Sequence, residues 1–365
     1  MNRRHIMVGG AALATLGAGA TWLTTARMGS TTDYAAATRA MRVGLPAQAG
    51  ARDLIRFATL APNGHNTQPW RFTAAPGAIT IRPDFARRTP VVDPDDHHLF
   101  VSLGCAAENL SLAAAARGHS GEPEFDGGDD GSITFAHRPT APRASPLFDA
   151  IPLRQSTRAE YDGRAVSPDT LKMLAVAGAN PDVDLVLITD RPMMDRIRDL
   201  VVAGNSAQMA DDAFVRELKS WLRFNPRQAQ RTGDGLYSAA SGNPALPDWL
   251  GPLAFDWLAT TRSQNDSYAS QIRSSAGIAV FFGARADPEH WVAVGRACQR
   301  FALQATALGL KHAFINQPVE VPALRPELAA LLGRPGRRPD VVMRFGFGPL
   351  MPYAPRRPVA SVMRA

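Results

Sequence analysis

Two long apolar stretches dominate the pattern of hydrophobic and polar positions along the chain. Residues 101–118 and 292–309 are rich in alanine, carry few charges and each end at a glycine, as expected of a buried helix with a C-terminal Gly. Aligned without a gap, the stretches share residue types at 101/292, 104/295, 106/297, 112/303, 114/305, 116/307 and 118/309. This shared spacing favours an internal duplication over the chance alignment of two Ala-rich helices.

Shorter elements occur in the same order in the two halves of the chain. Each half offers a helix, a strand, the long buried helix and a closing β-rich run, an order typical of an α+β sandwich. The ranges are helices 53–61 and 170–178, first strands 70–74 and 183–188, and closing runs 132–136 and 341–347. We therefore predict the α+β class, with two tandem sandwich halves.

The Pro-rich, non-periodic stretch 139–146 marks the predicted boundary between the halves. It separates an N-terminal half, 45–140, from a C-terminal half, 147–360. Between its first strand and its buried helix, the C-terminal half carries an extra segment at about 195–270. Because this segment contains an irregular Gly/Pro-rich run at 232–252, we interpret it as a mobile lid.

Residues 1–29 have the pattern of an export signal and are kept out of the predicted fold. Arg3 and Arg4 precede an uncharged Ala/Gly-rich stretch, 6–26, and 18–20 offers small residues for cleavage. This resembles a twin-arginine signal, so we expect export to the periplasm or another extracytoplasmic location. If it is retained, the stretch is about long enough to anchor the protein in a membrane, which takes roughly 20 residues. A frayed cytoplasmic tail is the remaining alternative.

Composition and charge change this picture little. The 365 residues are 45% hydrophobic and 20% charged, as in globular proteins, with a net charge of +7. The arginines are scattered and form no basic stripe interleaved with aromatic residues, so we predict no nucleic-acid partner. Cys105 and Cys298, the only cysteines, lie in the long apolar stretches and are predicted to be buried free thiols.

A short basic motif opens the C-terminal half. Arg154, Ser156 and Arg158 occupy alternate positions just after the apolar Ile151. Guanidinium and hydroxyl groups are suitable donors for a phosphate and a ribityl chain. Taken alone, the motif also describes many solvated surface strips.

A polar string at 61–70 is more specific. Its amide side chains can bond the carbonyls and hydroxyls of a cofactor or lock a loop, and its Pro and Gly favour a tight turn. An ordered connection from helix to strand is the alternative. The polar and turn residues concerned are Pro62, Asn63, Gly64, Asn66 and Gln68.

Together, the two motifs resemble the two ends of one flavin site in the nitroreductase superfamily, and the chain is most similar to its internally duplicated, Acg-like FMN-binding branch. The resemblance implies the nitroreductase α+β fold twice, packed as a pseudo-dimer with FMN between the halves. It also implies the FMN-binding residues, some from each motif, some after the second buried helix and some near the C-terminus. They are Pro62, Asn63, Gly64, Asn66, Gln68, Arg154, Gln155, Ser156, Arg158, Phe314, Asn316, Gln317, Arg356 and Arg357.

Each motif occurs once, which predicts one FMN per chain. Residues 178–182 stand where the C-terminal half would repeat the polar string, and 47–50 stand where the N-terminal half would repeat the basic motif. The resemblance implies an FMN-dependent oxidoreductase that passes a hydride or electrons through the flavin to an unknown small molecule. The alternative is an FMN-binding protein that sequesters the cofactor under its lid with little turnover.

We assign no catalytic side chain, because the flavin carries the hydride chemistry. A metal site at 93–98 is not predicted, since the adjacent His97 and His98 would point apart on a helix and an Asp at a helix start is an ordinary cap. The expected partners are a small-molecule substrate and an unknown electron donor. We expect membrane contact only through an uncleaved signal. The sequence does not determine the oligomeric state and is compatible with a monomer.

Overall fold

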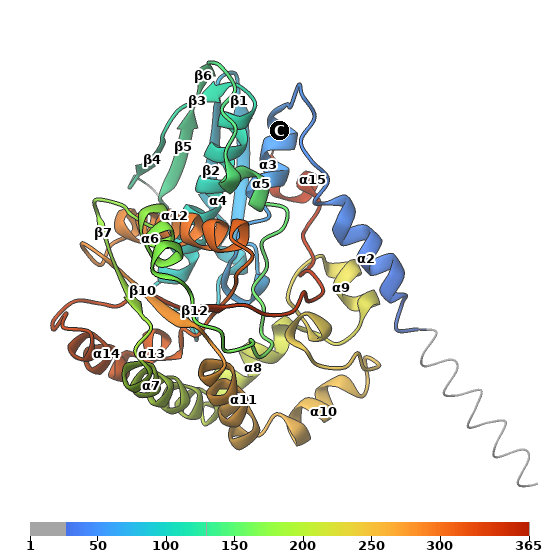
Figure 1. Cartoon of the computed structure of the whole chain (residues 1–365). Coiled ribbons are helices and arrows are strands. Elements are labelled where there is room, and N and C mark those ends of the chain that lie inside the picture. The colour runs from blue at the N-terminus through green and yellow to red at the C-terminus, as the bar shows by residue number, and fades with distance from the viewer. Residues whose placement is uncertain (1–26, 129, 365) are drawn as a thin grey trace, which may run out of the picture.

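The computed structural model describes residues 27–128 and 130–364 of the chain. The predicted signal, 1–29, therefore lies almost entirely outside the described residues. Two β-sheets and a pair of long central helices form the body of the molecule (Figure 1). One continuous hydrophobic core contains residues of both sheets and of both helices, for example Phe72, Leu103, Phe301 and Phe345.

The first sheet has five strands, and one of them comes from the far end of the chain. Its spatial order is β13 (Met363–Arg364), β1 (Trp70–Ala75), β2 (Ala78–Pro83), β5 (Ser132–Ala136) and β4 (Pro123–Asp126). β13 runs parallel to β1, with Phe72 opposite Met363, whereas the other neighbouring pairs are antiparallel. The C-terminal end of the chain thus completes the sheet of the N-terminal half.

The second sheet has four strands. Its order is β11 (Lys311–Phe314), β12 (Val341–Gly346), β10 (Gly277–Gly283) and β7 (Val183–Ile188), and every neighbouring pair is antiparallel. β10 is buried along its whole length. Neither β10 nor its counterpart β2 was predicted, and for β10 the reason is that periodicity alone cannot distinguish a continuous apolar strand from a buried helical segment.

The two sheets follow one plan, and the predicted α+β class is confirmed. The spatial order β1-β2-β5-β4 matches β7-β10-β12-β11. Each sheet has its long helix inserted at the same point, α4 (His97–Ala116) after β2 and α12 (Pro288–Ala307) after β10. This repetition is the arrangement expected from an internal duplication.

The two long helices meet at a pair of glycines. A Cβ atom on Gly104 would lie 2.1 Å from the carbonyl oxygen of Val292, and one on Gly295 would lie 2.1 Å from the carbonyl oxygen of Val101. Only glycine permits backbones to approach this closely. The reciprocal contacts join the positions that align between the two stretches, as an approximate two-fold axis between the helices would produce.

Shorter helices cover the central pair. α3 (Ala51–Ala58) packs on α4, whereas α5 (Pro146–Ala150) and α6 (Pro168–Ala177) pack on α12. α3 and α6 are the helices predicted at 53–61 and 170–178, and each begins slightly earlier than predicted. The remaining short elements are β3 (His119–Ser120), β6 (Arg138–Pro139), α13 (Gln317–Glu320), α14 (Arg325–Leu331) and α15 (Val359–Val362).

The extra segment of the C-terminal half, 195–270 and called the lid segment below, is mostly helical. α7 (Arg191–Met209) and α11 (Thr261–Arg273), which enter and leave it, pack against each other. The lid segment itself lies along the lower edge of the molecule in Figure 1. Its other elements are α8 (Asp212–Trp221), β8 (Leu222–Arg223), α9 (Pro226–Thr232), β9 (Leu236–Tyr237), the short 3-10 helix Ser238–Ser241 and α10 (Gly251–Leu258).

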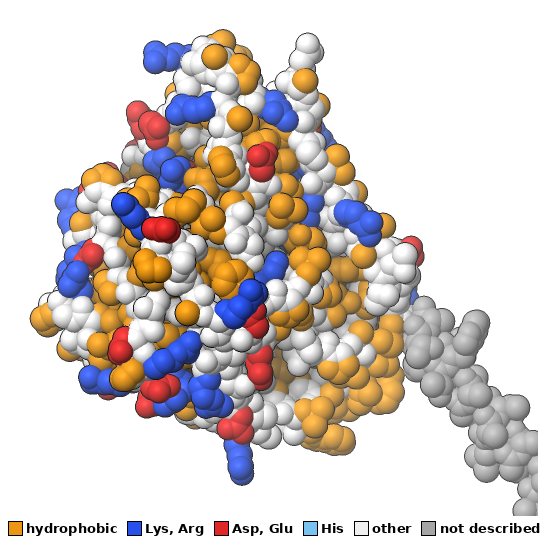
Figure 2. Space-filling view, in the orientation of Figure 1, with side chains coloured by type: hydrophobic (Ala, Val, Ile, Leu, Met, Phe, Trp, Pro, Cys, Tyr) orange, Lys and Arg blue, Asp and Glu red, His pale blue; other side chains and the backbone are white. Residues whose placement is uncertain are grey.

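Charged side chains are spread over the surface. Figure 2 shows Lys and Arg side chains distributed among acidic ones on the visible face, without a continuous basic stripe. Within the described part of the chain, only α4 is long and apolar enough to cross a membrane, and it is buried inside the molecule.

Cys105 and Cys298 are buried free thiols, as predicted, with their Sγ atoms 3.8 Å apart. Burial raises the pKa of the Cys105 thiol. Because the thiolate is the reactive form, we expect a disulfide reagent to label the native protein at least about 100-fold more slowly than the urea-unfolded chain. Release of the chromophoric thiol measures both rates, and equal rates would contradict the buried position.

Candidate functional site

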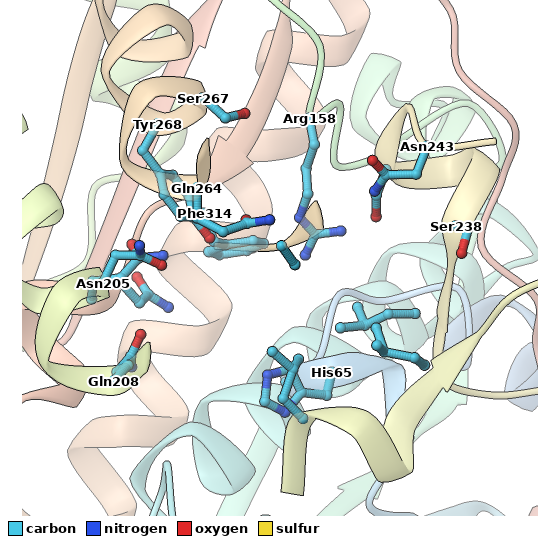
Figure 3. Close-up of a pocket in the computed structure, with 18 of the residues that line it drawn as sticks. His65, Arg158, Asn205, Gln208, Ser238, Asn243, Gln264, Ser267, Tyr268 and Phe314 are labelled. Atoms are coloured by element: carbon cyan, nitrogen blue, oxygen red, sulfur yellow. The ribbon is translucent and has the colours of Figure 1, made fainter. Parts of the chain in front are cut away.

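A cavity of about 430 Å³ lies where the two halves and the lid segment meet. One wall comes from residues 62–65, the first turns of α4 and the segment that follows β11. The other wall comes from the lid segment and α11. Figure 3 shows Arg158, His65, Phe314 and Tyr268 facing this space from different elements.

Half of the predicted site residues line the cavity, and they come from both halves of the chain. The polar string and the basic motif therefore meet in space although about ninety residues separate them. Their contact with a cofactor stays a prediction. The lining residues are Pro62, Asn63, Gly64, Arg158, Phe314, Asn316 and Gln317.

The polar string forms a tight loop with an unusual backbone. His65, Asn66 and Gln68 have φ angles of 45°, 54° and 55°, a left-handed conformation that side chains other than Gly rarely adopt. The Asn63 Oδ1 accepts a hydrogen bond of 2.7 Å from the Gln68 backbone N–H and closes the loop. Such over-determined backbone is typical of functional loops, and here it turns residues 62–65 toward the cavity.

Asn66 and Gln68 lie behind this loop and do not line the cavity. The Asn66 amide donates to the carbonyl oxygens of Gly235 and Pro355, at 3.0 and 3.1 Å. The Gln68 amide donates to the Gly233 carbonyl oxygen at 2.8 Å. Both side chains therefore tie the loop to the lid segment and to the C-terminal segment.

Arg158 supplies the positive charge of the cavity wall. Its side chain reaches the cavity (Figure 3), and no carboxylate of the described residues lies within 4 Å of its guanidinium. Arg344, which is fully buried, donates to the carbonyl oxygens of Thr157 and Ala159 at 3.0 and 2.8 Å. Arg344 thus fixes the backbone on both sides of Arg158, a positioning role that the sequence did not reveal.

Arg154 is buried without a full set of acceptors. Its Nη2 donates to the Leu60 carbonyl oxygen at 3.1 Å, whereas Nε and Nη1 have no hydrogen-bond partner within the described chain. The Arg356 Nη2 donates to the same Leu60 oxygen at 3.2 Å. The two guanidinium groups therefore converge on one carbonyl oxygen, and their contact with a phosphate stays a prediction.

Arg42 joins these two residues and was missed by the sequence analysis. Its guanidinium lies 3.9 Å from the centroid of the Tyr353 ring. Burial, and then the positive charge of Arg154, lower the pKa of Arg42 to about 9. Burial likewise lowers the pKa of Arg154 to about 10. Arg42 follows α2 (Thr31–Ala40) and belongs to no motif, so only the folded chain identifies it.

Arg42, Arg154 and Arg356, called the arginine cluster below, form a group of like charges in which Arg154 is buried and the other two are partly buried. Within the described chain none of the three pairs with a carboxylate within 4 Å. Buried charges without counter-ions are strongly unfavourable. The cluster, with the unpartnered donors of Arg154, is therefore suited to an anion with several acceptor oxygens, such as a phosphate.

The other predicted residues hold the C-terminal segment and the basic motif in place. The Gln155 amide exchanges hydrogen bonds of 2.8 and 2.9 Å with the Met351 backbone. Ser156 forms an isolated parallel bridge with His312 of β11. The Arg357 N–H donates to the Gln68 Oε1 at 2.9 Å. Of the two arginines near the C-terminus, Arg356 and not Arg357 belongs to the arginine cluster.

Several polar residues line the cavity wall formed by the lid segment and α11, opposite residues 62–65. No sequence motif predicts them as site residues. The Gln208 amide donates to the Glu320 carboxylate at 2.7 Å, and burial raises the pKa of Glu320. His98 lies 4.0 Å from the other carboxylate oxygen, and burial lowers the pKa of His98 to about 4. This side of the cavity offers mainly neutral amides and hydroxyls. The labelled members in Figure 3 are Asn205, Gln208, Gln264, Ser267 and Tyr268.

The expectation that His97 and His98 point apart is wrong, because their ring centroids lie 4.6 Å apart. His97 turns inward, with its Nε2 2.9 Å from the Asp340 Oδ1, and His98 lines the cavity. Their ligand atoms and an Asp93 oxygen lie within 4.8 Å of one another. The Asp93 carboxylate accepts the backbone N–H groups of His98 and Leu99, both at 3.0 Å, so it caps α4 as predicted.

Comparison with known proteins agrees with the resemblance carried by the motifs. No protein-family model matches the chain. The chain is 26% identical over 339 residues to "Putative NAD(P)H nitroreductase Rv3131" of Mycobacterium tuberculosis. This alignment covers 89% of this chain and 94% of that protein. It is 24% identical over 327 residues to "Putative NAD(P)H nitroreductase acg" of the same organism, covering 85% and 94%.

Solved structures resemble the chain more weakly. The FMN-dependent nitroreductase NfnB from Mycobacterium smegmatis, in complex with NADPH, covers 60% of this chain and 97% of its own, at 14% identity and a TM-score of 0.40. A nitroreductase with bound FMN from Desulfitobacterium hafniense covers 59% and 94%, at 14% identity and a TM-score of 0.35. The sequence similarity to the two Mycobacterium tuberculosis proteins, by contrast, extends over most of this chain and nearly all of theirs. It confirms the resemblance to the Acg-like branch of the nitroreductases.

Proposed function

We propose that the chain is an FMN-dependent oxidoreductase of the nitroreductase type, with one FMN between its two halves. The observation that carries the proposal is the arginine cluster, in which two nitrogens of the buried Arg154 have no partner within the described chain. Arg154 also opens the same motif as the cavity residue Arg158. The curated relatives are named as NAD(P)H nitroreductases, which supports redox chemistry on a small molecule.

The spacing of the basic motif suits a cofactor with a phosphate at one end and a ring at the other. Four residues of extended chain span at most about 14 Å, so Arg154 and Arg158 can serve two ends of one elongated molecule. The arginine cluster would hold the phosphate. Asn63, Arg158 and Phe314 would surround the ring in the cavity.

Bound FMN would supply the hydride chemistry. The positive charge of Arg158 would stabilise negative charge that develops on a group in the cavity, because its side chain faces that space. The neutral amides of the opposite wall can orient a small-molecule substrate through hydrogen bonds. Burial keeps His65 neutral by lowering its pKa to about 4.

We expect purified protein to be yellow and to release one FMN per polypeptide on denaturation. The reason is that Ala47 to Gly50 and Gly178 to Asp182 replace the two motifs at the equivalent second site. Flavin absorbance, measured against protein concentration from amino-acid analysis, gives the ratio. A ratio of two would show a second site, and colourless protein that binds no added FMN would contradict the proposal.

The alternative is a protein that holds FMN and turns over little. The lid segment favours it, because this segment and α11 supply much of the cavity wall. Anaerobic stopped-flow mixing of the flavin-loaded protein with NADH, NADPH or a quinol separates the two functions. An oxidoreductase loses its oxidised-flavin absorbance with at least one donor within seconds, whereas a holding protein keeps it with all of them.

The export signal predicted from residues 1–29 stays part of the proposal. Export by the twin-arginine route delivers folded, FMN-loaded protein outside the cytoplasm, where a nicotinamide donor is not expected. Cell fractionation and the mass of the mature N-terminus test this, and a full-length cytoplasmic product would contradict it.

A further inference from the structure

Helix α10 of the lid segment is apolar except at one residue. Its eight residues, Gly251–Leu258, include one charged side chain, Asp256, which pairs with Lys219. Ala254 and Phe255 line the cavity. A helix that is hydrophobic all round normally has protein or lipid on every side, yet only part of α10 packs against this molecule.

The other side of α10 exposes large apolar side chains to solvent. Trp249, Leu253 and Trp257 are 62%, 45% and 75% exposed, and none of them lines the cavity. They are spaced four residues apart, so they follow one side of the helix and of the turn before it. Leu258 is also 72% exposed but lines the cavity, so it does not belong to this side. Figure 2 shows hydrophobic side chains gathered at the lower right, over the region where Figure 1 labels α10. A contiguous patch of this kind marks an interaction surface.

The N-terminal part of the chain enters the described structure on the same side. The Arg227 N–H of α9 donates to the Met28 carbonyl oxygen at 2.9 Å, and Gly29 packs against the Arg227 backbone. Residues 6–26, which precede this contact, are uncharged in sequence. The described chain therefore begins beside α9 of the lid segment, directly after this uncharged stretch of the sequence.

We propose that the exposed side of α10 is a membrane-docking surface, defined by Trp249, Leu253 and Trp257, that enters the interfacial layer of a lipid bilayer. Indole side chains combine an apolar body with an N–H donor and favour the headgroup level of membranes. Nearby charges pair with each other, as Asp256 with Lys219 and Arg262 with Asp266. Docking thus rests on apolar insertion rather than on anionic lipid.

This surface goes beyond the proposed function and does not depend on it. Because the opposite side of α10 lines the cavity, docking places one cavity wall about one helix diameter, roughly 10 Å, from lipid.

Hydrogen exchange measured by mass spectrometry on the full chain tests the surface. Vesicles of neutral phosphatidylcholine are expected to slow exchange in peptides covering 247–260 at least about fivefold. Trp257→Glu should abolish this slowing. Leu253→Glu should act in the same way. Val176→Glu is the matched control, because Val176 is 69% exposed on α6 and should leave the slowing intact. Near-ultraviolet circular dichroism confirms that each variant is folded.

Three results would overturn the proposal. The first is unchanged exchange at 247–260 in protein that is bound to vesicles. The second is slowing that persists in folded Trp257→Glu and Leu253→Glu. The third is a slowing of exchange that occurs without vesicles and increases with protein concentration. This result would assign the exposed side of α10 to contact with a second copy of the chain.

Discussion

Replacing Arg154 with methionine is expected to weaken FMN binding at least about 100-fold and to raise the melting temperature of the FMN-free protein. Charge-assisted hydrogen bonds contribute about 1.5–3 kcal/mol each, and each 1.4 kcal/mol is a factor of ten in affinity. Without a bound anion, the same guanidinium is buried beside Arg42 and Arg356 with two of its nitrogens unpartnered. Its removal relieves this repulsion, because methionine fills similar space without charge.

Arg154 is the most informative member of the arginine cluster. Arg356 also donates to the carbonyl oxygens of Thr59, Leu60 and Ala61, so its loss would unfold the loop as well as weaken binding. Fluorescence titration of the apoprotein with FMN and with riboflavin provides the measurement. Riboflavin lacks the phosphate and should bind Arg154→Met and the unmodified protein equally.

Arg164→Met is the matched control for Arg154→Met. Arg164 lies on the same connecting segment but is 67% exposed and pairs with Asp162 at the surface, where ion pairs contribute little. It should change neither FMN affinity nor melting temperature. If Arg154→Met instead lowers the stability of the apoprotein and retains FMN, Arg154 has a structural role and the phosphate site lies elsewhere.

The sequence predicted those features that depend on local periodicity. The strand at 183–188 and the closing strand at 132–136 have the predicted bounds, because each is a short apolar run between turn residues. The long helices α4 and α12 were found for the same reason. The aligned glycines at 104 and 295 favoured a duplication, but the contact that they make between the two helices was not predicted.

Features formed by contacts between distant residues could not be predicted. Arg42 carries no motif, and its neighbours Pro152 and Tyr353 are remote in sequence. β13 is only two residues long and is stabilised by its pairing with β1. The same limit explains Asn66 and Gln68: the polar string identified a loop near the cavity, but sequence could not show which amides face the cavity and which bind the lid segment.

Replacing Gly104 with alanine is expected to lower the free energy of unfolding by at least about 2 kcal/mol. Alanine in a helix gains up to about 1 kcal/mol over glycine from propensity. The new Cβ, however, would lie 2.1 Å from the Val292 carbonyl oxygen, which belongs to the backbone of the facing helix. Overpacking of a well-packed core costs about 1–3 kcal/mol and occasionally more. The cost is at the upper end here, because two helix backbones must move apart rather than one side chain.

Gly295→Ala should have an equal effect, because its Cβ would meet the Val101 carbonyl oxygen at the same distance. The double variant should lose less than the sum of the single losses, since one separation of α4 from α12 relieves both clashes. Equilibrium urea unfolding measures all three values. Gly44→Ala is the control, because no atom lies within 4 Å of its added Cβ, and it should stay within about 0.5 kcal/mol of the unmodified protein. Unequal single effects would show that the helices relax differently on their two sides, and full additivity would show that the two glycine contacts are independent.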